Sequence, residues 1–173
     1  GPITMPNVEE STNYTLLAVV SYQPTTGPED LYNPNDVVAG PATDVNPAVI
    51  DIVATQATKT LGDNVLGGTA GKATVTIQNQ GNVLAKGTAI VTFYASATGE
   101  VDEDAVEIGS ATRSVSLKPN ASTTISGNIV MPNVEESTDL AVIAVVEFVP
   151  NEGLLGETEN DNNSAVAPAT TVA

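Results

Sequence analysis

The clearest strand signal in the chain is the stretch Lys72–Gln78, which reads KATVTIQ. Its apolar members Ala73, Val75 and Ile77 alternate with polar residues, so they fall on one face of an extended chain. Threonine and the β-branched aliphatic residues pack well on a pleated sheet. The sequence NQGN follows at once at Asn79–Asn82, a composition typical of a tight turn. The stretch therefore predicts a half-buried strand that ends in a turn.

Segments of the same kind recur on both sides of this strand. The predicted strands are Ala48–Ala57, Lys72–Gln78, Thr88–Ser96, Ala111–Leu117, Ser122–Met131, Leu140–Val149 and Ser164–Thr171. No segment shows the 3.6-residue apolar period of a helix. Short strands at this spacing predict an all-β fold, an antiparallel β-sandwich of the immunoglobulin or fibronectin III type. The almost wholly apolar Leu140–Val149 is expected to be a central strand buried on both faces.

The alternation also predicts which side chains meet in the interior. Aromatic residues make up only 3% of the chain and tryptophan is absent, so aliphatic side chains must fill the core. The predicted core residues are Val75, Ile77, Val91, Phe93, Leu117, Ile125, Val142 and Ala144.

The chain also contains an internal repeat. Ile3–Thr12 reads ITMPNVEEST, and Ile129–Thr138, 126 positions later, reads IVMPNVEEST. After one inserted residue, Pro41-Ala42-Thr43 matches Pro168-Ala169-Thr170. A period of about 126–127 residues is the size of a domain and far longer than a solenoid repeat. The sequence therefore predicts a tandem array of similar domains.

This period sets the expected domain organisation. Residues 44–173 hold one complete immunoglobulin-like domain, and residues 1–43 hold the C-terminal strands of a preceding, incomplete repeat. Two strands are too few for stability in water, and an apolar strand at Leu16–Tyr22 would leave backbone groups unpaired. We expect this segment to pair with other copies of the chain or with neighbouring repeats. The alternative is that it is the cut end of a longer array.

Composition excludes several kinds of chemistry. The chain has no cysteine and no histidine, so disulfides, thiol catalysis and histidine-based catalysis cannot be built from it. Its formal net charge is -16, with only five lysines and arginines, which disfavours nucleic acids and anionic membranes. No apolar run reaches the length of a membrane span. We expect no enzymatic activity, no nucleic-acid partner and no membrane insertion.

Several short motifs of the complete repeat resemble those of a known family. They are IQNQG at residues 77–81, YAS at 94–96, IG at 108–109, LKP at 117–119 and ETENDNN at 157–163. In this order they resemble the CARDB family, the cell-adhesion-related domains of bacterial surface proteins. The resemblance covers roughly residues 48–172, and residues 3–43 match only the closing strands. It implies an immunoglobulin-like sandwich in a secreted or surface-anchored protein, and no particular ligand. Asn120 stands where the family commonly has glycine.

Two acidic clusters are candidates for a cation site. The first follows the predicted strand that ends at Ser96 and consists of Glu100, Asp102, Glu103, Asp104 and Glu107. Ca²⁺ takes six to eight oxygen ligands, and Asp102, Asp104 and Glu107 are the candidate calcium ligands. A solvated acidic loop is the main expectation there and the calcium site is the alternative. The second consists of Glu157, Glu159, Asp161, Asn162 and Asn163. Asn and Asp favour turns, so structural turn chemistry is the main expectation there and a metal the alternative.

These observations predict a structural or adhesive repeat module of a large extracellular or cell-surface protein, acting as a spacer or an assembly unit. One alternative is a self-assembling extracellular filament subunit that shares β-strands between chains. Another is a calcium-stabilised, ligand-binding accessory module, whose glycan or protein ligand the sequence does not name. No cofactor is expected apart from calcium.

Overall fold

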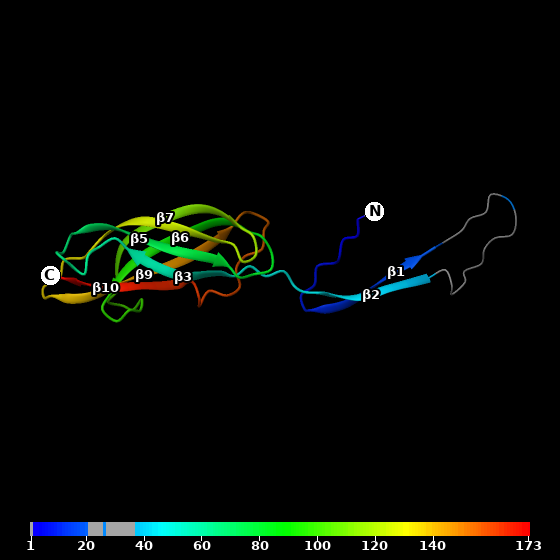
Figure 1. The fold of residues 1–173 in the computed structure, drawn as a ribbon, viewed down its shortest axis with the longest axis horizontal. Helices are drawn as coiled ribbons and strands as arrows, with labels where there is room; N and C mark the ends of the chain where they lie inside the picture. The colour runs from blue at the N-terminus through cyan, green and yellow to red at the C-terminus, as the bar shows by residue number, and fades with distance from the viewer. Residues whose placement is uncertain (1, 21–25, 27–36) are drawn as a thin grey trace. The chain divides into compact units, whose positions relative to one another are not determined.

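The computed structural model describes residues 2–20, 26 and 37–173 and divides into two compact units, Gly1–Ala48 and Val49–Ala173. Each unit is described by itself. All the regular elements of the described residues are β-strands (Figure 1), which confirms the predicted all-β class. Across the same residues, no helix is long and apolar enough to cross a membrane.

The second unit contains eight strands. They are β3 (Ile52–Lys59), β4 (Asn64–Val65), β5 (Ala70–Asn79), β6 (Ala85–Ser96), β7 (Val106–Leu117), β8 (Ser122–Val130), β9 (Thr138–Pro150) and β10 (Ser164–Val172). One sheet has the order β4-β10-β9-β6-β7, and the other has the order β3-β5-β8. The β10–β4 pair is parallel, and every other pair is antiparallel.

The two sheets of this unit enclose one apolar core. Val75 and Ile77 come from β5, while Val91 and Phe93 come from β6, and all four are fully buried. The eight predicted core residues all belong to this single cluster, so the predicted core is confirmed. Strand alternation explains the result, because a period of two sends every second side chain to the same face. The arrangement is consistent with the predicted β-sandwich.

Some predicted strand limits differ from the observed ones. The first strand of the unit begins at Ile52 instead of Ala48, and β7 begins at Val106 instead of Ala111. The two-residue strand β4 was not predicted, because a strand this short has no period to detect.

The expectation that Leu140–Val149 is buried on both faces is wrong in part. β9 is central, lying between β10 and β6, but its outward face is only partly covered. Ile143 is buried there, whereas Val145 is half-buried, and Glu147 and Val149 are exposed. An apolar run marks a central position in an antiparallel sheet without requiring that both faces be covered.

The first unit contains the hairpin of β1 (Thr12–Val19) and β2 (Val37–Val45), which pair antiparallel. Thr12 lies opposite Val45 and Val19 opposite Val37, with a register irregularity between Thr15 and Leu17. The predicted strand Leu16–Tyr22 thus begins earlier than expected, at Thr12, while its last residues lie outside the described part of the chain.

The pairing of β1 with β2 reproduces that of β9 with β10. Thr138 lies opposite Val172 and Val145 opposite Ser164, the counterparts of the pairs that end the first hairpin. The register irregularity also recurs, between Ala167 and Thr170 on β10. A local bond recurs as well: the Thr12 hydroxyl donates to the Glu10 carbonyl oxygen at 3.0 Å, as Thr138 does to Glu136 at 2.9 Å. The sequence repeat is therefore also a repeat of backbone pairing.

Candidate functional site

One buried polar residue organises the turn that follows β5. The Asn79 side chain is fully buried, and its amide nitrogen donates to the Val83 carbonyl oxygen at 2.8 Å and to the Leu117 carbonyl oxygen at 2.9 Å. Its amide oxygen accepts from the Gly81 backbone nitrogen at 3.0 Å. Because a buried amide is costly unless it is hydrogen-bonded, this full set of partners fixes the loop to the end of β7. The asparagine of the IQNQG motif therefore has a structural role.

Close packing of the backbone requires the glycine of the same motif, Gly81. A Cβ atom at Gly81 would lie 2.2 Å from the Val49 carbonyl oxygen and 2.9 Å from the Ile50 Cα atom. Both neighbours are backbone atoms, which cannot rotate away. Only glycine allows this approach.

The first acidic cluster lies in the loop between β6 and β7. The Thr98 hydroxyl donates to one carboxylate oxygen of Asp102 at 2.7 Å, and the Asp104 backbone nitrogen donates to the other at 3.1 Å. The bond from Thr98 is the main reason that the pKa of Asp102 lies below its ordinary value, with the loop's backbone bonds adding to it. Asp102 therefore shapes its own loop.

The three predicted calcium ligands occupy different local settings. Asp102 and Asp104 lie in the loop, whereas Glu107 lies on β7, opposite Tyr94 of β6. Among the described residues, no group of three or more acidic side chains is gathered closely enough to hold a metal ion. The calcium site at Asp102, Asp104 and Glu107 stays a prediction.

The second acidic cluster ties the loop before β10 to the start of β3. The Ile52 backbone nitrogen donates to Glu157 at 2.6 Å, and the Asn163 side chain donates to the other oxygen of Glu157 at 3.1 Å. The Asn162 side chain donates to Asp51 at 3.0 Å. Burial, together with the nearby charge of Asp51, raises the pKa of Glu157 although these hydrogen bonds oppose the shift.

This cluster includes a residue that sequence reasoning missed. Asp51 precedes β3 and is more than a hundred positions from Asn162, so no local motif could have joined them. The side-chain oxygens of Asn162 and Asn163 are buried without a hydrogen-bond partner, and buried acceptors of this type ordinarily take a bond from water. Both amide groups donate to carboxylates and not to their own backbone, and the turn itself is closed by the bond from the Asn163 backbone nitrogen to the Asn160 carbonyl oxygen.

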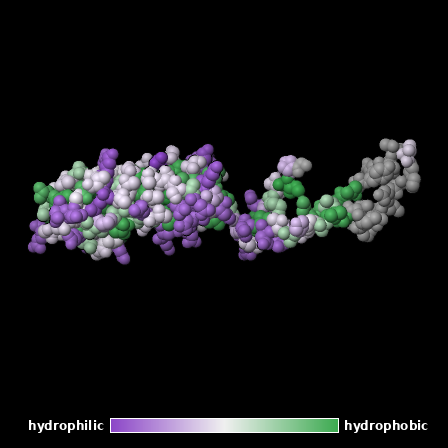
Figure 2. Space-filling model, in the orientation of Figure 1, coloured by the Kyte–Doolittle hydropathy of each residue, from purple (hydrophilic) through white to green (hydrophobic). Residues whose placement is uncertain are grey.

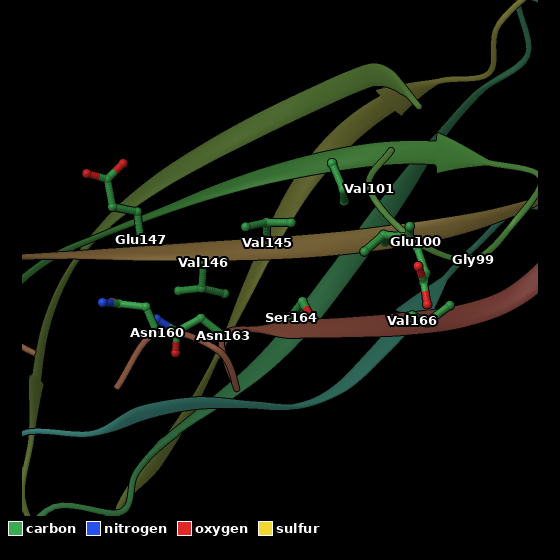
Figure 3. A pocket seen from close by; sticks show the side chains of 11 residues that line it. Gly99, Glu100, Val101, Val145, Val146, Glu147, Asn160, Asn163, Ser164 and Val166 are labelled. Carbon is green, nitrogen blue, oxygen red and sulfur yellow. The ribbon is translucent and has the colours of Figure 1, made fainter. Parts of the chain in front are cut away.

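A pocket of about 580 Å³ lies on the outward face of β9 and β10 (Figure 3). Its floor includes Ile143, Val145 and Val166, and the Gly99–Val101 segment of the acidic loop forms one wall. Two carboxylates, those of Glu100 and Glu147, belong to its lining, which has no basic residue. The pocket therefore favours neutral or cationic groups over anions.

The first unit carries a different kind of surface. Leu16, Leu17, Val19 and Val20 of the β1 region and Val38 of β2 are all exposed, and Figure 2 shows apolar surface on this hairpin. An apolar groove of about 390 Å³ runs beside it, with Ile3, Met5, Tyr14 and Leu16 among its lining residues. Adjacent residues of a strand point to opposite faces, so apolar side chains are exposed on both faces of this hairpin. Exposed apolar surface of this extent is uncommon on soluble domains and marks a contact site. This surface is the main candidate for function.

Among known proteins, the matches to this chain come from solved structures. No family model matches the chain, and no curated protein matches it. The crystal structure of a CARDB domain from Pyrococcus furiosus, in complex with di-metal ions, is 18% identical with a TM-score of 0.42. The match covers 72% of this chain and 90% of that one.

Two further solved structures are also similar to this chain. A solution structure of the same Pyrococcus furiosus domain has a TM-score of 0.43, with coverage of 72% of this chain and 96% of that one at 18% identity. A β-glucosidase from Erythrobacter marinus is 12% identical with a TM-score of 0.44, and the match covers 72% of this chain but only 16% of the enzyme. The solved structures similar to this chain thus include CARDB domains, the family that its motifs resemble.

Proposed function

We propose that this chain is a non-enzymatic, structural or adhesive repeat module of a large extracellular or cell-surface protein, acting as a spacer or assembly unit. Its fold is taken to be an immunoglobulin-like or fibronectin III-like sandwich, repeated in tandem every 126–127 residues. The observation that carries this proposal is the pairing of β1 with β2 in the register of β9 with β10. A chain that carries one domain and the closing hairpin of another is suited to an array.

The chemistry of the chain supports a structural role. The lack of histidine and cysteine removes the commonest catalytic groups. The formal net charge of -16 favours solubility and keeps polyanions away. Other copies or neighbouring repeats are the proposed partners because the β1–β2 hairpin exposes apolar side chains that such a partner could cover. Neither nucleic acid nor the membrane interior is a proposed partner.

The location and the role can be tested on cells of the source organism. An antibody raised against the chain should label intact cells or the growth medium, before permeabilisation. Labelling that appears only after permeabilisation would contradict the extracellular role. The native protein recovered with the antibody should be much larger than this chain and should contain further copies of the repeat.

A separate measurement distinguishes a spacer from a filament subunit. The mass of the purified chain in solution should be that of a monomer if it is a spacer, whatever its concentration. Growth of the mass with concentration, into open-ended assemblies, would favour the filament alternative.

A further inference from the structure

The β1–β2 hairpin leaves exposed the side chains whose counterparts are buried in β9 and β10. Leu16 is 50% exposed and Val20 is 66% exposed, whereas their counterparts Val142 and Val146 are 1% and 3% exposed. Because the two hairpins pair in the same register, these residues occupy equivalent places on equivalent strands. The second unit therefore shows how these side chains are buried when the neighbouring strands of the sandwich are present.

In the second unit, β9 is covered along one edge by β6 and on its inner face by the other sheet. Ala144 of β9 lies opposite Phe93 of β6, and both are fully buried. The first hairpin offers Ala18 at this place, a side chain small enough to lie beside the same ring. A strand equivalent to β6, if paired with β1, would therefore have the same small residue, alanine, opposite its phenylalanine.

One polar side chain of the β1–β2 hairpin also matches its counterpart on β10. The buried Thr170 of β10 donates its hydroxyl to the Gly62 carbonyl oxygen at 3.1 Å. Its counterpart on β2 is Thr43, which is exposed. A threonine at this position can make the same bond if a body like the second unit surrounds the hairpin.

The segment before β1 extends the match to the second sheet. Ile129 and Met131, at the end of β8 and just after it, are buried. Their counterparts Ile3 and Met5 are exposed and line the apolar groove of the first unit. Residues 3–5 therefore correspond to the end of β8, a strand of the β3-β5-β8 sheet. Together with the β1–β2 hairpin, they give the first unit counterparts of strands from both sheets.

The hairpin is too closely tethered to replace β9 and β10 of its own chain. The Ala54 backbone nitrogen bonds to the Asn162 carbonyl oxygen, so β3 starts near one end of β10, whereas Thr171, near the other end, bonds to Asp63. β10 has nine residues, a length of roughly 26 Å between its ends. Val45, the counterpart of the last residue of β10, is only four peptide steps from Val49, which is held by two hydrogen bonds to Asn82, and four steps span roughly 14 Å when fully extended. The place that the hairpin would take in the second unit of the same chain is also already occupied, by β9 and β10.

We propose that residues 2–20 and 37–45 close a second β-sandwich: the β1–β2 hairpin pairs with a β6-type strand and covers the inner sheet of a neighbouring repeat body that lacks its own β9–β10 pair. The occupant of the exposed apolar face is thus a body of the same repeat, made of counterparts of β3 to β8. This inference rests on the proposed tandem architecture and specifies how consecutive units share strands.

A chimeric chain tests the fit directly. Residues 138–172 of the full chain are replaced by residues 12–45, so that the β1–β2 hairpin follows β8 in place of β9 and β10. The chimera should fold to a monomer with a β-rich circular dichroism spectrum and a cooperative melt. Leu16→Asp at the grafted position should abolish the melt, while Thr15→Asp, on the opposite face, should leave it. A chimera without a cooperative melt, beside a parent that has one, overturns the proposal.

A complementation experiment tests the same contact between two chains. The full chain is refolded with an acceptor of residues 46–137, which lacks both the β1–β2 hairpin and the β9–β10 pair, and the mixture is analysed by size-exclusion chromatography with light scattering. A 1:1 complex is expected, and Leu16→Asp in the full chain should weaken it by roughly a hundredfold or more, because a carboxylate would enter an apolar core.

The controls separate this contact from other kinds of association. Thr15→Asp should leave the complex intact, and a complex that resists Leu16→Asp overturns the proposal. Oligomers of the full chain alone that depend on Leu16 would show that a closed second copy is the occupant, which also overturns it. Cell-surface labelling decides the proposed function independently, so a failed complex with labelled cells would reject only the shared strands.

Discussion

The Asn79 side chain reaches across the end of the sandwich and donates to the Leu117 carbonyl oxygen at 2.9 Å. This single bond joins β5 of one sheet to β7 of the other, because the two residues end these two strands. The same amide also holds the Val83 carbonyl oxygen and the Gly81 backbone nitrogen. Asn79 is therefore the point where the two sheets and the intervening turn are fixed together.

Replacing this residue should be costly. Asn79→Leu leaves two carbonyl oxygens and one backbone N–H without their partner, which predicts a loss of about 2–4 kcal/mol in the free energy of unfolding. Urea unfolding followed by circular dichroism measures the loss. Gln80→Ala, at the exposed neighbouring position, is the matched control and should cost less than about 0.5 kcal/mol. Equal stabilities of the two variants would contradict the assigned role.

The glycine at position 127 should not tolerate a side chain. A Cβ atom at Gly127 would lie 2.6 Å from the ring of Phe93, which is fully buried. Because the ring has no room to retreat, Gly127→Ala should lower the free energy of unfolding by about 1–3 kcal/mol. Gly62→Ala is the control, since its nearest neighbour would be 3.9 Å away. Thermal melts of both variants should differ clearly, and a harmless Gly127→Ala would refute the packing argument.

The turn between β7 and β8 should accept glycine in place of Asn120. Asn120 has a φ angle of 63°, and the Ala121 backbone nitrogen bonds to the Lys118 carbonyl oxygen at 2.9 Å, as in a turn with Pro119 at its second position. Asn120→Gly should leave stability within about 0.5 kcal/mol, whereas Asn120→Val should cost about 1–2 kcal/mol, because a β-branched residue is strained at positive φ. Equilibrium unfolding decides between them, and a well-tolerated valine would speak against the turn geometry.

The stability of the second unit should depend on the ionisation of Glu157. Its pKa is raised in the folded state, mainly by burial, so the folded state holds this proton more tightly than the unfolded state. Stability from this group is therefore present at low pH and is lost as the pH rises from about 4.3, the ordinary glutamate value, through the raised pKa.

Glu157→Gln removes this ionisation. The difference in free energy of unfolding between the wild type and Glu157→Gln should therefore shift against the wild type as the pH rises through this range. Urea unfolding at several pH values measures it. Glu152→Gln, at an exposed position, is the matched control for the removal of a carboxylate. A difference that moves the other way for Glu157→Gln would mean that its hydrogen bonds outweigh its burial.

The calcium prediction has a direct test. If Asp102, Asp104 and Glu107 bind Ca²⁺, millimolar calcium should raise the melting temperature relative to excess chelator, because a ligand that binds only the folded state stabilises it. The double substitution Asp102→Asn with Asp104→Asn should abolish the rise. Identical melts with calcium and with chelator would remove this site.

The strand pattern predicted the core well because alternation is a local property. Val75 and Ile77 could be assigned to the interior from the residues beside them, and both are fully buried. The partners of Asn79 could not be predicted in this way, because Leu117 is 38 positions away and meets it only after the sheets have formed. The same limit explains why Asp51 was missed beside Asn162. Local patterns thus specify which face a residue takes, and the topology decides which residue it meets.

The central place of β9 has a consequence for synthesis on the ribosome. β9 fills the middle of the five-stranded sheet, yet it and β10 are the last strands of the unit to be translated. Before β9 and β10 have been synthesised, one edge of β6 has no partner strand, because its long-range pairing with β9 cannot form earlier. In the proposed array, where each repeat offers a similar hairpin to such an open edge, mispairing between repeats during translation is expected. Slow synthesis across the segment before β9 would lengthen the time in which this mispairing can occur.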